Sequence, residues 1–70
     1  MTALAIRGSS HIAGADYDAE TRILTVYFQD GDAYEYSQVP PEVAAAFERA
    51  PSAGQYFHRM IRQRYVGVPT

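Results

Sequence analysis

The strongest hydrophobic pattern in the chain is the segment Arg22–Phe28, in which apolar, β-branched and aromatic side chains follow one another. Such residues favour strands, and successive side chains of a strand point to opposite faces of a sheet. Leu24, Val26 and Phe28 therefore share one face, which is the more apolar of the two. We predict a strand here, with this face turned toward the core.

Two weaker segments flank this strand. Ser9–Asp18 contains strand-forming residues without strict alternation, and Gly14 in its middle predicts a bulge. Ala33–Ser37 follows Gln29-Asp30-Gly31-Asp32, and Asp-Gly is a strong signal for the turn of a β-hairpin. The expected sheet is a three-stranded antiparallel meander.

Two helical patterns follow the sheet. Pro41 suits the first position of a helix that ends near Ala50, because Pro51 disfavours helix in the residue before it. Ser52 predicts the cap of a second helix, with Gln55 completing a capping box. Apolar residues recur at helical spacing in both: Val43, Ala46, Phe47 and Ala50 in the first, and Phe57, Ile61 and Tyr65 in the second.

The predicted fold class is therefore α+β, a three-stranded antiparallel β-meander followed by two α-helices (βββαα). Seventy residues make one domain, which we place at residues 9–65, between a flexible N-terminal arm at 1–8 and a C-terminal tail at 66–70. A chain this short buries only about 60% of its unfolded surface. An enclosed catalytic cavity is hard to build beside so small a core, so we expect a protein that is not an enzyme.

Composition narrows the class further. The chain has no cysteine, which excludes disulfides and thiolate metal sites. Its first residues lack the basic region of a signal peptide, and no apolar run is long enough to cross a bilayer, so we expect a cytoplasmic protein without a membrane partner. The absence of lysine and asparagine, with abundant alanine, is typical of a GC-rich bacterial genome.

Two histidines and a serine pair are the only further candidates for chemistry. His11 and His58 stand alone in the sequence and do not form a ligand set, so no metal or cofactor is expected. Ser9-Ser10-His11 suggests a nucleophile and a base. Neighbouring strand residues point to opposite faces, however, and no oxyanion motif accompanies them.

Charge is segregated along the chain. Residues 1–48 carry all eight acidic side chains and two arginines, a net charge of −6, whereas residues 49–70 carry four arginines and no acid, a net charge of +4. Either the two parts attract one another within the fold, or the second part offers a basic face to an anionic partner. Arg59 and Arg62, three residues apart on the second helix, are the candidates for such a face.

The start of the second helix is another candidate anion site. Ser52 and Gly54 lie where free amides and the helix dipole point outward, an arrangement that can bind phosphate. The alternative is that Ser52 only caps the helix and that Gly54 allows close packing against the sheet.

The order and spacing of several short motifs resemble the KTSC domain, a module named for the carboxy terminus of certain lysyl-tRNA synthetases. The motifs are Ser9-Ser10-His11-Ile12, Tyr17-Asp18, Leu24/Val26/Phe28, Gly31, Tyr34-Glu35-Tyr36, Val39-Pro40, Ala50-Pro51-Ser52-Ala53-Gly54 and Ile61-Arg62. Tyr34 and Tyr36 match the family's tyrosine-x-tyrosine centre. Asp16 and Pro51 depart from the expected pattern. The resemblance covers residues 9–65 and implies RNA binding as the suggested role.

The length of the hairpin turn decides where Tyr34 and Tyr36 point. A two-residue turn at Asp30-Gly31 places both on the face of Tyr27, as a platform on which unpaired bases can stack. A three-residue loop of Asp30-Gly31-Asp32 pairs Phe28 with Tyr34 and puts both tyrosines in or against the core. The first arrangement also turns Glu35 toward the helices, which costs stability.

Two functions follow from these features. The first is a small RNA- or tRNA-binding module that uses Tyr34 and Tyr36 if they are exposed, with Arg59, Arg62 and the Ser52–Gly54 amides contacting phosphates. The second is a protein-interaction or homodimerisation module, because aromatic residues are enriched at interface cores.

Overall fold

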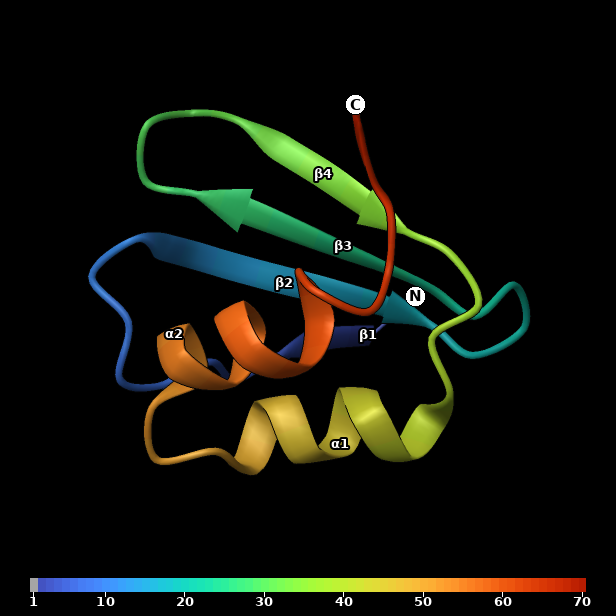
Figure 1. Cartoon of the computed structure of the whole chain (residues 1–70), viewed down its shortest axis with the longest axis horizontal. Helices are drawn as coiled ribbons and strands as arrows, with labels where there is room; N and C mark the ends of the chain where they lie inside the picture. Colours follow the sequence, from blue (N-terminus) through green and yellow to red (C-terminus); the bar gives the residue numbers. More distant parts are fainter. Residues whose placement is uncertain (1) are drawn as a thin grey trace.

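One antiparallel sheet of five strands forms the body of the protein in this computed structural model, which describes residues 2–70. The strands follow one another in sequence order across the sheet (Figure 1). They are β1 (Thr2–Leu4), β2 (Ile12–Asp18), β3 (Ile23–Phe28), β4 (Ala33–Tyr36) and β5 (Gly67–Pro69). Between β4 and β5 lie α1 (Pro41–Arg49), α2 (Ala53–Tyr56) and a π-helical turn, η1 (Phe57–Ile61), that continues α2. The class is α+β, as predicted.

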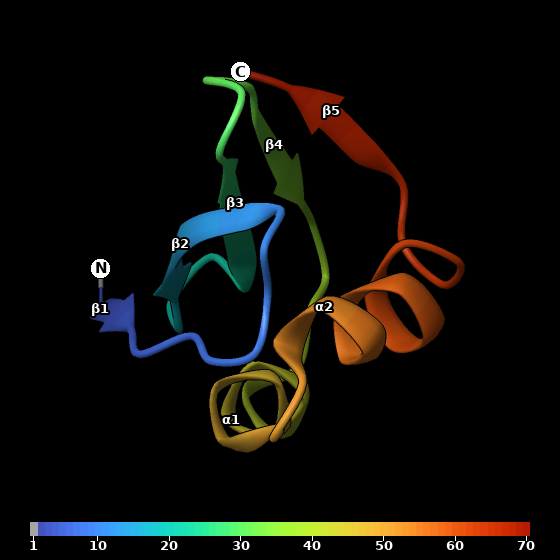
Figure 2. The same ribbon diagram turned by 90° about the vertical axis from the view of Figure 1, so that its left-hand side faces the viewer.

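The predicted βββαα order is incomplete, because four strands precede the helices and a fifth follows them. β1 lies in the segment expected to be an arm and pairs with β2, and β5 lies in the expected tail and pairs with β4 (Figure 2). Both strands have only three residues, and β5 contains glycine and proline, which are depleted in strands. An edge strand tolerates Pro69, since its nitrogen need not donate to a neighbour. The two short segments become ordered because they pair with β2 and β4, and no local sequence pattern predicts this pairing.

The three central strands follow the predicted meander, including its irregularity. The β2–β3 register shifts between Ile12 and Gly14, where the bulge was predicted. The β3–β4 hairpin differs from both alternatives, because Val26 lies opposite Tyr34 and Phe28 N donates to Asp32 O at 2.8 Å. The loop is therefore Gln29–Gly31, three residues long but displaced by one position. That displacement moves the pairing by two residues, which preserves the face of every side chain.

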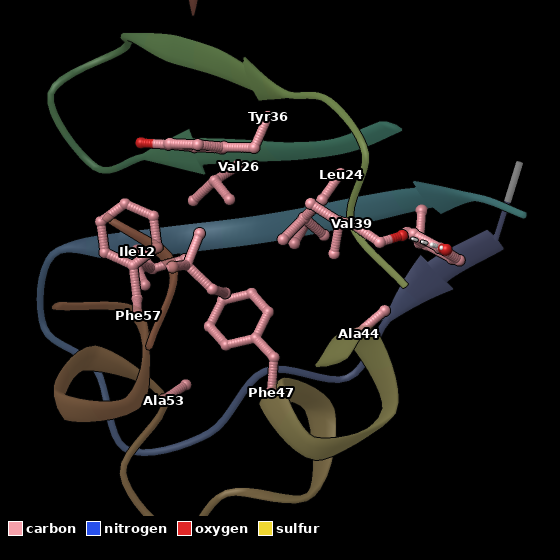
Figure 3. Close-up of a cluster of buried hydrophobic side chains, with 12 residues drawn as sticks. Ile12, Leu24, Val26, Tyr36, Val39, Ala44, Phe47, Ala53 and Phe57 are labelled. Atoms are coloured by element: carbon pink, nitrogen blue, oxygen red, sulfur yellow. Dashed lines mark hydrogen bonds between the residues drawn. The ribbon is translucent and has the colours of Figure 1, made fainter. Parts of the chain in front are cut away.

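Both helices pack on one face of the sheet, and the core lies between the two layers (Figures 1 and 3). Pro41 opens α1 as predicted, and Phe47 is fully buried against the sheet. Ala44, which was not in the predicted buried stripe of this helix, is also buried. Val43, which was in that stripe, is only partly covered. Fully buried side chains of large volume are Leu24, Val26, Val39, Phe47 and Ile61. No helix within residues 2–70 has the length and apolar character needed to cross a bilayer.

The second face of the sheet is not covered by the helices, and its side chains are largely polar. A row across it contains Asp16, Thr25 and Glu35, which lie opposite one another on β2, β3 and β4. Tyr27, on the same face, donates its hydroxyl to Asp16 Oδ2 at 3.0 Å. This hydrogen bond is the main reason why the pKa of the Tyr27 phenol is raised. The face is thus acidic, and Glu35 avoids the helix side.

Candidate functional site

The tyrosine pair lies on the helix side of the sheet, so it does not form an open stacking platform. Tyr36 is only 5% exposed, and its ring meets the edge of Phe57 at a centroid distance of 5.6 Å. Figure 3 shows the Tyr36 ring reaching along the core toward Phe57. Burial raises the pKa of the Tyr36 phenol, and the nearby positive charge of Arg62 opposes that rise.

Tyr34 is less enclosed than its partner. Its side chain is half-buried and packs edge-on against Phe28, with ring centroids 5.9 Å apart. The two tyrosines therefore play different parts, because Tyr36 belongs to the core and Tyr34 stands at its margin. The two-residue turn that exposed both is excluded by the observed register.

The start of the second helix is occupied by contacts within the chain. Ser52 caps the helix as predicted by accepting from Gln55 N at 3.4 Å, and Ala53 N donates to Arg7 O at 2.7 Å. A Cβ on Gly54 would stand 3.2 Å from Ser9 Oγ. Two of the first three amides of the helix are thus occupied, that of Ala53 by the chain before β2 and that of Gln55 by the Ser52 cap. The geometry favours the packing alternative over phosphate binding at Ser52 and Gly54.

The segment before β2 fits closely against the loop between the helices. Gly8 has φ +64°, and a Cβ there would overlap Pro51 O. Ser52 Oγ also donates to Gly8 O at 3.2 Å. Glycine is required here both for the left-handed backbone and for the contact. The fit fixes Ser9 and the residues after it beside the second helix.

Arg59 and Arg62 do not form one basic face. Arg62 lines a pocket between the helix and the sheet, whereas Arg59 lines a separate hollow with Gln55, Tyr56 and Met60. The cause lies in the helix itself, since Arg62 N donates to Phe57 O at 2.8 Å, five residues back. This wider π-helical turn differs from the 3.6-residue spacing on which a shared face was predicted.

The pocket beside Arg62 has a volume of about 410 Å³ and gathers residues that are distant in sequence. We call it the first pocket. Its polar lining side chains are Ser9, His11, Gln29, Asp30, His58 and Arg62, and its apolar ones include Ile12, Phe28 and Phe57. It lies where the start of β2 and the end of β3 meet the second helix. His11 and His58, which stand 47 positions apart in the chain, thus line one pocket.

A second pocket of about 310 Å³ adjoins the first and shares three of its walls. Its lining residues are Phe28, Tyr34, Tyr36, Phe57, Arg62 and Gly67. The shared walls are the two phenylalanines and Arg62. The guanidinium side chain is exposed, whereas Phe57 is 7% exposed. Together the two pockets form an aromatic-lined depression, and the cation Arg62 lines both of them.

Sequence reasoning missed most of this site because its members come from five segments. Ser9-Ser10-His11 was considered as a catalytic motif, and His58 as one of two isolated histidines. No grouping of three or more potential metal ligands occurs within residues 2–70. Sequence reasoning did select four residues of the lining, which are Tyr34, Tyr36, Gly54 and Arg62. The other lining residues come together because the β2 bulge and the π-helical turn orient the chain.

Comparison with known proteins agrees with the geometry of the fold. A family model described as the KTSC domain matches residues 8–65. A crystal structure of a KTSC domain protein from Yersinia pestis superposes with a TM-score of 0.83 at 29% identity, covering 93% of this chain and 92% of that one.

Two relatives show the settings in which similar sequences occur. The lysine–tRNA ligase of Nostoc punctiforme is 41% identical over 49 residues, which are 70% of this chain but only 9% of the ligase. An uncharacterized protein of Stutzerimonas stutzeri is 39% identical over 57 residues, 81% of this chain and 80% of that protein. The chain thus spans about a tenth of the ligases it matches. By the family model and by its structure, this chain belongs to the KTSC domain family.

Proposed function

We propose that this protein is a small non-catalytic module that binds single-stranded RNA in the depression formed by the first and second pockets. The observation that carries the proposal is the position of Arg62 between two pockets lined by aromatic rings. Unpaired bases stack on aromatic side chains, and arginine binds the phosphate backbone. The depression offers both chemistries within one site.

Charge supports the same surface. The second pocket is lined by Arg62 and by no acidic side chain, whereas the first is lined by both Arg62 and Asp30. The opposite face of the sheet carries Asp16 and Glu35 and would repel a phosphate backbone. This difference favours an anionic partner at the pockets over one on the open face of the sheet.

The family's setting adds further support. Related sequences form part of proteins named lysine–tRNA ligase, whose substrate is an RNA. The sequence predicted an exposed tyrosine face as the stacking surface, whereas the site proposed here is the depression formed by the two pockets. Tyr34 still belongs to the proposed site, because it lines the second pocket, whereas Tyr36 mainly forms part of the wall of that pocket.

A titration of labelled single-stranded RNA, followed by fluorescence anisotropy near about 50 mM salt, tests the proposal. Replacing Arg62 with glutamine removes one phosphate contact, so the slope of log affinity against log salt should fall by about 0.7. Arg59→Gln is the matched control, since it removes the same charge from the same helix outside both pockets. Absence of binding, or equal losses in the two variants, would refute the proposal.

Self-association is a second candidate function, favoured by the last strand. β5 is an edge strand, and Val66 and Val68 beside and within it are 83% and 54% exposed. Unpaired edge groups with exposed apolar side chains can pair with a second copy. Light scattering over a concentration series tests this: a Val68→Lys variant should dissociate the dimer, and a monomer at every concentration would exclude it.

A further inference from the structure

The most specific arrangement in the molecule is the pair of pockets separated by one arginine. Both pockets include Arg62, Phe28 and Phe57 in their lining. Their volumes, about 410 and 310 Å³, both lie at the low end of the range for pockets that hold a small molecule, about 300–1,000 Å³. Each therefore suits a single ring system, and neither suits a folded duplex.

The first pocket has polar groups that can orient a base and its sugar. Ser9 Oγ accepts from His11 N at 3.2 Å and from Ile12 N at 3.0 Å. Because a hydroxyl has two lone pairs and one hydrogen, these bonds leave Ser9 as a donor. Asp30 adds an acceptor, although one of its oxygens already accepts from Asp32 N at 3.1 Å.

The second pocket is more aromatic. Tyr34 stands at its margin and Tyr36 forms a buried wall, and both rings lie edge-on to a phenylalanine. Gly67 completes the lining, and a Cβ at this position would lie 2.7 Å from the Tyr36 ring. The absence of a side chain at residue 67 thus keeps β5 close above the tyrosine.

We propose that the two pockets hold two successive nucleotides of a single strand, with the phosphodiester between them bound by Arg62. The inference rests on the proposed function and specifies its ligand. The assignment follows from the shared lining, since Arg62 belongs to both pockets and can therefore contact a phosphate that joins groups held in them. Phe28 and Phe57, common to both pockets, separate the two bases.

The smallest ligand that tests this arrangement is adenylyl-(3′→5′)-adenosine, compared with adenosine 5′-monophosphate. The monophosphate carries more charge per phosphate, so tighter binding of the dinucleotide comes from its second nucleoside. We expect the dinucleotide to bind about tenfold more tightly, the effect of one added stacking interaction. NMR shift changes should appear at the amides of both His58 and Gly67 with the dinucleotide.

Three variants assign the contacts. Arg62→Gln should weaken binding of the dinucleotide, because the phosphate that connects its two nucleosides loses its cation. His58→Gln should weaken binding of both ligands, since it alters the first pocket, and its side chain is exposed, so the fold should persist. Arg59→Gln is the control and should change neither affinity. Thermal unfolding of each variant checks that the fold is intact.

The possible failures are distinguishable. If a hexanucleotide of adenosine binds but the dinucleotide binds no better than the monophosphate, the two-nucleotide site is refuted and RNA binding by another arrangement stands. If binding of the hexanucleotide is indifferent to Arg62→Gln, the two-nucleotide site and RNA binding in this depression are both refuted. If the hexanucleotide does not bind at about 50 mM salt, the proposed function and this inference both fail.

Discussion

Replacing Gly67 with alanine tests whether β5 holds Tyr36 in the core as the structure describes. A Cβ at residue 67 would lie 2.7, 2.8 and 2.9 Å from Cε1, Cζ and Oη of the Tyr36 ring. Carbon atoms at optimal separation stand about 3.5–4.0 Å apart, so the new methyl group overlaps the ring by more than half an ångström.

The overlap cannot be relieved cheaply. The Tyr36 ring is 5% exposed and packs against Phe57, and so a shift of the ring disturbs the core. The alternative is that β5 moves away and loses its pairing with β4. Inserting one extra methyl group into a packed site typically costs about 1–3 kcal/mol. For a domain of this size each kcal/mol lowers the Tm by about 4–8 °C.

Urea unfolding followed by circular dichroism measures the effect, and the m-value reports whether β5 remains in place. Gly14→Ala is the matched control, because nothing lies within 4 Å of its added Cβ. It should be neutral or should stabilise by about 0.4–1 kcal/mol, through a less flexible unfolded chain. A Gly67→Ala variant as stable as the parent would refute the close packing of β5 on Tyr36.

Three further predictions concern stability and its pH dependence. Tyr17→Phe should cost about 1–2 kcal/mol in urea unfolding at neutral pH, because Tyr17 Oη donates to Val39 O at 2.6 Å in the core; no loss would contradict that bond. Burial raises the pKa of the Tyr17 phenol above its ordinary value of 10.0. As the pH rises above that value, the unfolded state loses the phenol proton while the folded state keeps it, so the free energy of unfolding falls. Between about pH 9 and 11 the free energy of unfolding should therefore fall less steeply in Tyr17→Phe than in the parent protein. Thr25→Val should stabilise by about 1 kcal/mol in thermal unfolding, since the Thr25 hydroxyl is buried without a partner in the described residues, and a destabilised variant would argue against this. Gly8→Ala should lower the Tm by more than Gly14→Ala changes it, because of the positive φ and the overlap with Pro51 O, and equal effects would contradict the fit.

Much of the fold could be predicted from local patterns. The Leu24, Val26 and Phe28 face, the bulge near Gly14, Pro41 at the start of α1 and the Ser52 cap are all as predicted. Each rests on a few neighbouring residues whose preferences agree. The face of the tyrosine pair was left open, because it depends on a turn whose length the residues Gln29–Asp32 do not specify.

The candidate site was less accessible. Arg62 was selected for its charge, but its partners His11 and His58 come from opposite ends of the domain. Arg59 was grouped with it on the assumption of regular helix spacing, which the turn at Phe57–Ile61 changes. Ser52 and Gly54 were candidates for phosphate binding, and the chain before β2 occupies their surroundings.

The sequence by itself determined the class of fold, the family and the segregation of charge, because strand alternation, caps and motif order are local properties. Tertiary structure alone decided that Thr2–Leu4 and Gly67–Pro69 join the sheet, that Tyr36 is buried while Tyr34 stays at the margin, and that Arg62 lines two pockets. These outcomes depend on register and on contacts between distant segments. A shift of one residue in a hairpin or a wider helical turn reverses them without changing composition.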